Sequence, residues 1–279
     1  MKITERLLPK GRPWAEGWPE GHPSGVTWHW TAGGSLAGCY ATIGPVPGAR
    51  DDASAHYAVG RTLKEGIDQY VLLDDRSFHA GKNQTLRGDG KPRTGAGESA
   101  SRMYIGVETV HLGWVREGNP ATPGTAAYPG VDCSSLYQIP PWTEACIEGC
   151  VVVARAIIAR WPHIRAEDHH GHGDLCPNYK VDPLGFPFAR VLSEAYGVKV
   201  PDVWGATRTF QQRQAALNAL SVRRPDLQIA QLKVDGVFGN ASKTALRVAR
   251  LALCGVADSM WPTAFSWRLH EAGALPSAA

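Results

Sequence analysis

The chain has 279 residues, of which 43% are hydrophobic and 20% charged, and its formal net charge is +3. This composition is ordinary for a globular protein, and the length allows one full domain and a smaller second one. No run approaches the roughly 20 apolar residues of a membrane span, and residues 1–18 lack the apolar core of a signal peptide, so we expect no membrane insertion and synthesis without an export signal.

The first informative element is a strand predicted within GVTWHWTAGG, at residues 25–34. Val26, Trp28 and Trp30 alternate there with polar residues, and period-two alternation is typical of a half-buried strand. His29 would leave this strand on the polar face, opposite the tryptophans. A single histidine on a strand is more often a hydrogen-bonded structural residue, so its function depends on what the rest of the chain supplies.

A second short strand is predicted at residues 105–110, and it contains Glu108. Strands disfavour glutamate, and a buried acid needs a partner. A general acid–base role would account for this placement; the alternatives are an exposed strand residue or an ion pair with an arginine. The segment from 99 to 141 includes GNPATPGTAAYPG, which predicts a long loop after the strand that contains Glu108, and long loops of this kind often contribute to a functional site.

The clearest helix is predicted in TEACIEGCVVVARAIIARW, with Thr143 as N-cap and Pro162 as its stop. Its apolar residues form a stripe at helical spacing, which indicates an amphipathic helix packing on a sheet. Cys146 and Cys150 lie one turn apart on it. The six cysteines of the chain form no disulfide framework, so we expect these two to be small, reduced core residues.

Metal-ligand residue types concentrate in HHGHGDLCPNYKVDPLGFP, at residues 169–187. Nine residues separate His172 from Asp182, and Lys180 lies two positions before the aspartate. Zinc takes nitrogen and oxygen ligands, and a catalytic site typically has three protein ligands with an open position for water. His29 is the best donor of the third ligand. The pattern therefore predicts a zinc hydrolase site.

Several blocks, in order along residues 20 to 190, now carry a resemblance. TWHWTAGG, ASAHYAVGR, QYVLLDDRSFHAG, YIGVETV and GHGDLCPNYKVDP resemble the zinc-dependent N-acetylmuramoyl-L-alanine amidases, which share their fold with peptidoglycan recognition proteins. The resemblance implies an α/β domain with a mixed central β-sheet flanked by helices, and bacterial peptidoglycan as the substrate.

Site residues follow from the resemblance position by position. It implies His29, His172 and Asp182 as ligands of a Zn2+ cofactor, with Glu108 and Lys180 as the catalytic pair. Glu108 would handle protons, and Lys180 would stabilise the oxyanion. His79, in SFHAG, matches a histidine that lies beside the substrate cleft in the family, and we expect it to contact substrate rather than metal.

Other histidines and one cysteine near these motifs are weaker candidates for site residues. Cys176 could supply a thiolate ligand, since some relatives use cysteine in place of aspartate. However, His172 and Asp182 already match the spacing of the relatives that use aspartate, so no further ligand is needed at Cys176. His169 and His170 are expected to hydrogen-bond around the site or to pack on a strand, and His56 to be structural. His111 stands where relatives commonly carry asparagine, so its role stays open.

The pattern changes after the predicted catalytic domain, residues 1–195. A linker at 196–206 is followed by a helical segment, 207–279, in which LKVDGVFGNASKTALRVARLAL predicts a turn-rich loop and a helix capped by Ser242 or a near neighbour. The Asp-Gly-x-Phe-Gly loop resembles that of small three-helix peptidoglycan-binding domains. The alternative is a helical cap on the first domain.

Charge supports a wall-facing role for this segment. Residues 198–279 hold 10 basic and 5 acidic residues, a net charge of +5, whereas the rest of the chain has 19 basic and 21 acidic residues, a net charge of −2. A basic module would be attracted to an anionic envelope. Nucleic acid is not favoured as a partner, because no stacking platform or groove-reading motif accompanies the charge.

The function predicted from these patterns is hydrolysis of the amide bond between N-acetylmuramic acid and L-alanine. Without an export signal, a phage endolysin made in the host cytoplasm fits, as does an enzyme that recycles wall fragments. A monomer is expected. Two alternatives stay open: a catalytically inactive peptidoglycan-binding protein, and a zinc peptidase that cuts within the stem peptide.

Overall fold

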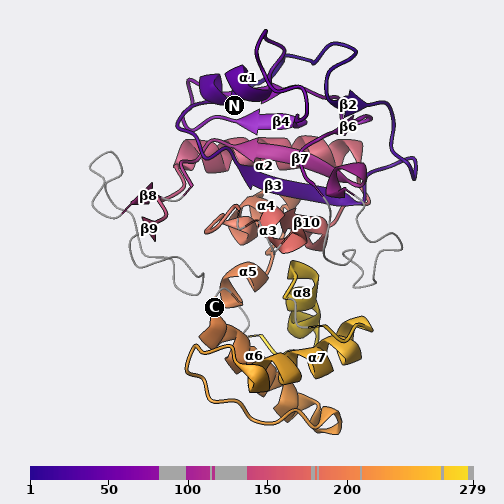
Figure 1. Cartoon of the computed structure of the whole chain (residues 1–279), viewed down its shortest axis with the longest axis vertical. Helices are drawn as coiled ribbons and strands as arrows, with labels where there is room; N and C mark the ends of the chain where they lie inside the picture. Colours follow the sequence, from indigo (N-terminus) through magenta and orange to yellow (C-terminus); the bar gives the residue numbers. More distant parts are fainter. Residues whose placement is uncertain are drawn as a thin grey trace.

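The computed structural model describes residues 1–81, 99–113, 115–116, 137–176, 180, 182–207, 209–258 and 261–275. Figure 1 shows a unit built on a β-sheet at one end of the long axis and a group of helices, from the C-terminal part of the chain, at the other. Among the residues described, no helix combines the length and apolarity needed to cross a bilayer.

The central sheet has six strands in the order β1-β5-β4-β7-β3-β10. All neighbouring strands run parallel except the antiparallel pair β4 and β5, so the sheet is mixed, as predicted. The strands are β1 (Ile3–Glu5), β3 (Gly25–Trp30), β4 (Tyr57–Val59), β5 (Ile67–Gln69), β7 (Tyr104–Thr109) and β10 (His169–Gly171).

Helices cover both faces of this sheet. Successive side chains of β4 point to opposite faces: Tyr57 and Val59 join the main core with α2 (Glu144–Arg160) and α4 (Phe188–Tyr196), whereas Ala58 packs in a second cluster with α1 (Leu36–Ile43). Burial on both faces explains why β4 carries only apolar and aromatic side chains. The mixed sheet flanked by helices is thus confirmed.

Helix α2 confirms the prediction from its amphipathic stripe. The Thr143 hydroxyl caps it by accepting a hydrogen bond from the Cys146 backbone amide, and the helix ends at Arg160, before Pro162. Cys146 and Cys150 are buried in the main core. The five cysteines within the described residues are all free thiols, as expected.

Short elements complete the first unit. Strand β2 (Trp14–Ala15) pairs with β6 (Arg76–Ser77), and β8 (Val115–Arg116) pairs with β9 (Tyr137–Gln138). A 3-10 turn, η1 (Ala100–Arg102), precedes β7. The predicted long loop around GNPATPGTAAYPG, like Cys133, lies outside the described residues.

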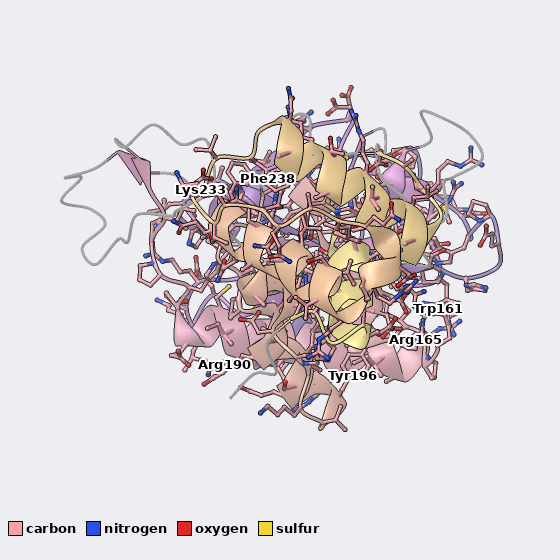
Figure 2. All side chains as sticks on the ribbon, turned by 90° about the horizontal axis from the view of Figure 1, so that it is seen from below. Trp161, Arg165, Arg190, Tyr196, Lys233 and Phe238 are labelled. Carbon is pink, nitrogen blue, oxygen red and sulfur yellow. The ribbon has the colours of Figure 1, made fainter. Side chains whose placement is uncertain are left out.

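The C-terminal helices form a second hydrophobic core of their own. They are α5 (Val203–Ala206), α6 (Phe210–Arg223), α7 (Asn240–Cys254) and α8 (Thr263–Glu271), with a 3-10 turn η3 (Pro225–Leu227) after α6. Figure 2 views the molecule from the side of these helices and labels Lys233 and Phe238 in the loop that precedes α7. The segment is therefore helical, as predicted, while the exact domain boundaries stay a prediction.

The Asp-Gly-x-Phe-Gly loop is tied to α6. The Gln214 side-chain amide donates to Asp235 Oδ1 at 3.0 Å, and its oxygen accepts from the Gly236 amide at 2.9 Å. Gly239, and not Ser242, occupies the N-cap of α7, while Ser242 is buried within the helix. The loop is thus a structural part of the helical unit.

Candidate metal centre and catalytic site

The predicted site residues meet at one edge of the central sheet. His29 is near the end of β3 and pairs in register with Glu108 of β7. On the other side of β3, β10 leads directly into the short helix α3 (His172–Leu175), whose first residue is His172 (Figure 1). Because these three strands are parallel, their carboxyl ends lie at the same edge, which is where ligands bind in open α/β sheets.

The three predicted ligands form a compact, buried group. His29 Nδ1 lies 3.3 Å from Asp182 Oδ2, and His172 Nδ1 lies 3.4 Å from the same oxygen. One ligand atom from each of the three residues falls within 4.8 Å of the others. Tetrahedral zinc, with bonds of about 2.0–2.2 Å, places its ligand atoms about 3.3 Å apart. The spacing of these atoms therefore fits a zinc ion.

Hydrogen bonds fix which nitrogen of His29 is available to a metal. His79 Nε2 lies 2.8 Å from the Tyr104 carbonyl oxygen, which can only accept, so Nε2 carries the proton. In a neutral His79 ring Nδ1 must then accept, and His29 Nε2, 2.9 Å away, must donate to it. This leaves His29 Nδ1, the nitrogen that faces Asp182, with its lone pair free for a metal.

The protonation states in the site also suit metal binding. Burial, reinforced by the neighbouring His172, lowers the pKa of His29 to about 4. Burial alone would raise the pKa of Asp182, but the adjacent His172 and His29 outweigh it and hold the pKa well below its usual value. A neutral imidazole and an ionised carboxylate are the forms that coordinate zinc.

Glu108 lies beside this group on β7. Its Oε2 atom is buried and accepts no hydrogen bond within the described part of the chain. Burial, together with the nearby charge of Asp182, raises the pKa of Glu108 to about 8, and Lys180 opposes the shift. The ion pairs found among the described residues do not include Glu108, so the alternative of an arginine partner gains no support there. Perturbed carboxyl groups of this kind are typical of active sites.

A cleft of about 570 Å3 opens beside the site. His79, His172 and Lys180 line it, so the structure brings together residues that are up to 101 positions apart in the chain. Three arginines that the sequence analysis did not single out also line the cleft: Arg50, Arg76 and Arg102. They come from three separate segments without a shared motif, and no signal in the sequence would have grouped them.

Cys176 and His56 lie outside the metal-binding group found among the described residues. Cys176 is fully buried in an apolar cluster with Leu175 and Tyr104. His56 Nδ1 accepts from the Gly106 amide at 3.0 Å, and its Nε2 lies 2.9 Å from the Asp75 carbonyl oxygen. Both side chains support the sheet around the site.

The remaining histidines pack away from the metal group. His169 Nδ1 accepts from the Trp28 indole at 3.1 Å, which ties β10 to β3. His170 contacts the Tyr104 ring edge-on. His111, whose role the sequence left open, stacks on Trp142 with the ring centroids 4.1 Å apart, and its Nε2 lies 2.9 Å from a backbone carbonyl oxygen. It is therefore a packing residue.

Comparison with known proteins agrees with this geometry. The sequence profile of the N-acetylmuramoyl-L-alanine amidases matches residues 19–185. The chain belongs to this family. The buried His29, His172 and Asp182 group is typical of the family's zinc site, so the amidase is a zinc enzyme. No curated protein is significantly similar in sequence.

Solved structures resemble the amidase at low sequence identity. AmpDh3 from Pseudomonas aeruginosa is 17% identical, with 89% of this chain and 90% of that chain covered and a TM-score of 0.48. AmiD from E. coli, solved with anhydro-N-acetylmuramic acid-L-Ala-D-gamma-Glu-L-Lys, is 18% identical over 89% and 88% of the chains, with a TM-score of 0.48. An endolysin mutant from Bacillus subtilis is 15% identical over 70% and 99%, with a TM-score of 0.42.

Proposed function

We propose that this amidase is a phage endolysin that cleaves the bond between N-acetylmuramic acid and L-alanine in the intact cell wall of the host. The observation that carries the reaction is the buried group of His29, His172 and Asp182 with Glu108 beside it. The basic C-terminal unit, with its peptidoglycan-binding-like loop, supports the wall as the site of action.

Zinc ligation is proposed for the two histidines and the aspartate, through the atoms that already face one another. A zinc ion held there supplies a Lewis acid that polarises the scissile carbonyl and acidifies the attacking water. The hydrogen-bond chain from Tyr104 through His79 orients the His29 ring, so the metal site does not have to reorganise on binding.

Glu108 is proposed as the group that moves the proton. The positive charge of a zinc ion beside Glu108 would favour its ionised form. This carboxylate accepts a proton from the attacking water and then delivers it to the leaving nitrogen of L-alanine, so that the amine departs neutral. The buried position suits this role because an unpartnered oxygen is available to the water. Lys180 lines the same cleft, and its ammonium would stabilise the negative oxygen of the tetrahedral intermediate.

The cleft is proposed to bind the stem peptide. Its arginines, Arg50, Arg76 and Arg102, favour an anionic substrate, although Arg50 is already paired with Asp52. A stem peptide such as the one bound to E. coli AmiD contains a γ-linked glutamate, which keeps a free carboxylate. His79 also lines the cleft, so the substrate contact expected of it remains part of the proposal.

The reaction is tested by digesting purified peptidoglycan with the wild type, His172→Ala and Glu108→Gln, and by measuring fragment masses and zinc content together. Free stem peptides that begin with L-alanine, absent for both variants while Glu108→Gln still holds zinc, are the expected result. Fragments cut between amino acids would instead make the chain a zinc peptidase. A wild type that binds wall but releases nothing would make it a binding protein.

The endolysin role needs a second comparison, between intact cell walls and soluble muropeptides. An endolysin should turn over intact walls faster and should sediment with them. The variants Arg223→Glu and Lys233→Glu, which reverse charge on the helical unit away from the cleft, should weaken sedimentation and leave cleavage of soluble fragments unchanged. Preference for soluble fragments would indicate a recycling enzyme.

A further inference from the structure

A short segment of irregular backbone forms part of the cleft lining beside the metal centre. It comprises residues 78–80, which directly follow strand β6, and all three of them line the cleft. None of the three lies in a strand, so their backbone groups are not paired in a sheet. Backbone amides away from water need another acceptor. Whatever supplies that acceptor therefore decides where the cleft lining lies.

Two serine hydroxyls take the place of a neighbouring strand. The Phe78 amide donates to Ser54 Oγ at 2.8 Å. The amides of His79 and Ala80 both donate to Ser101 Oγ, at 2.9 Å and 2.8 Å. The Ser101 hydroxyl in turn donates to the Ala80 carbonyl oxygen at 2.9 Å. A serine hydroxyl has one proton to donate and two lone pairs, so Ser101 uses its whole bonding capacity on this segment.

Ser101 also belongs to a second part of the cleft lining. It lies in the middle of η1, and only 4% of it is exposed. This turn contacts both β6 and β7, which lie side by side (Figure 1). The next residue, Arg102, lines the cleft. One buried hydroxyl therefore joins the segment 78–80 to the turn that carries a cleft arginine.

The segment reaches the metal centre through the His79 side chain. Nε2 of His79 donates to the Tyr104 carbonyl oxygen at 2.8 Å, and its Nδ1 accepts from His29 Nε2 at 2.9 Å. The ring of His79 is thus held at both nitrogens, while Ser101 holds the backbone from which the ring projects. A shift of that backbone would displace the ring that orients His29.

We propose that Ser101 is a positioning residue for the amidase reaction, which holds the cleft lining in place and, through His79, the ring of His29. This inference rests on the proposed function, because the reaction and the zinc ligation are proposed there. The Ser101 hydroxyl has no bonding capacity left for substrate, so its effect passes through the residues that it holds.

Amide hydrogen exchange of the metal-free, full-length protein tests the structural step. Ser101→Ala leaves two backbone amides without their acceptor, and we expect fragments that cover residues 78–81 to exchange about 5-fold faster, the factor that corresponds to one hydrogen bond. Ser101→Cys keeps nearly the same size but offers only a weak acceptor, so an intermediate rate is expected. It also provides the comparison if Ser101→Ala does not fold.

Zinc affinity and steady-state kinetics test the functional step. By competition with a chromophoric chelator, the zinc dissociation constant of Ser101→Ala should rise about 3- to 10-fold. With a soluble muropeptide as substrate, KM should rise by a similar factor. At saturating zinc, kcat should stay within about 2-fold of the wild type, because the bound ion itself fixes His29 and Glu108 lies on β7.

Ser193→Ala is the matched control. The Ser193 hydroxyl on α4 accepts from the Val200 amide at 2.9 Å and donates to the Ala189 carbonyl oxygen, so it too ties backbone groups together, but it does not line the cleft. Thermal unfolding of the metal-free proteins compares their stability. This variant should lose stability and keep the wild-type zinc affinity, KM and exchange at residues 78–81.

Two results would overturn the positioning role. One is a Ser101→Ala variant with the zinc affinity and KM of the wild type, even if its segment 78–81 exchanges faster. The other is an equal loss of zinc affinity in Ser101→Ala and Ser193→Ala, since both would then reflect general destabilisation.

Failure of the proposed function gives a different result. A wild type that shows the predicted order of exchange rates and zinc affinities, yet cleaves neither wall nor muropeptide, keeps the hold of Ser101 on the metal centre and removes the amidase. A wild type that cleaves, beside an unaffected Ser101→Ala, removes the positioning role alone. A wild type without measurable zinc affinity overturns both.

Discussion

Replacing Gly106 with alanine tests how closely the sheet supports the metal centre. Gly106 lies on β7 beneath the ring of His79, the residue that hydrogen-bonds His29. A Cβ at this position would lie 2.3 Å from His79 Cγ, 2.5 Å from Cδ2 and 2.6 Å from Cβ. All three atoms belong to one side chain, so the substitution acts on that side chain.

The distances give the size of the effect. Carbon atoms attract only beyond ~3.5 Å, so the His79 ring must withdraw by about 1 Å. Such a shift breaks the 2.8 Å bond to Tyr104 and the 2.9 Å bond to His29. Overpacking costs about 1–3 kcal/mol, and each lost hydrogen bond about 1 kcal/mol. We expect the free energy of unfolding to fall by roughly 3–5 kcal/mol, or Tm by roughly 6–20 °C, together with weaker zinc binding.

Calorimetric unfolding of four proteins provides the assay: wild type, Gly106→Ala, His79→Gly and the double variant. His79→Gly removes the three atoms nearest to the new Cβ. Adding Gly106→Ala to His79→Gly should therefore lower the free energy of unfolding by less than about 1 kcal/mol. The same substitution in the wild type should lower it several times more. Equal costs in the two backgrounds would refute the assigned clash.

Three further predictions concern buried charge and the metal. Burial lowers the pKa of His56 to about 4, below the ~6.5 of an unfolded histidine. Stability is thus full above pH 6.5 and falls by up to about 3 kcal/mol as the pH drops towards 4; denaturation of the wild type and His56→Gln at several pH values measures this. Asp258→Ala removes the carboxylate paired with the fully buried Arg250, and should cost about 3 kcal/mol in denaturant unfolding. Zinc at a thousandfold excess over its dissociation constant should stabilise the folded protein by about 4 kcal/mol. Removing the zinc with a chelator should therefore lower Tm.

Each of these has an outcome that contradicts it. If the free energy of unfolding of His56→Gln depends on pH as steeply as that of the wild type, groups other than His56 dominate the acid sensitivity. An Asp258→Ala variant as stable as the wild type would mean that the Arg250 charge is compensated elsewhere, and Arg250→Met combined with Asp258→Ala is the control that removes both charges. A Tm that does not depend on zinc concentration would contradict metal binding to the folded state.

Local sequence patterns predicted the elements of this protein well. Alternation around His29 predicted β3, and the apolar stripe with Thr143 before it predicted α2. Both features repeat within a single element, so they can be read without knowledge of the fold. The spacing of His172 and Asp182 in one short loop likewise limited their separation, and the structure brings both together with His29.

Contacts between distant segments were not predictable in this way. The register of β3 and β7 places Glu108 beside His29, and the segment that follows β6 places His79 against Nε2 of the His29 ring. The meeting of the three arginines in the cleft is likewise a contact between distant segments. Such contacts depend on how the chain closes over long loops and on which surfaces pack, neither of which leaves a local pattern. The sequence by itself determined which helices and strands form and which of them carry the candidate ligands. Tertiary packing decided the hydrogen-bond partners of these side chains, and therefore the tautomer of His29 and the burial of Glu108.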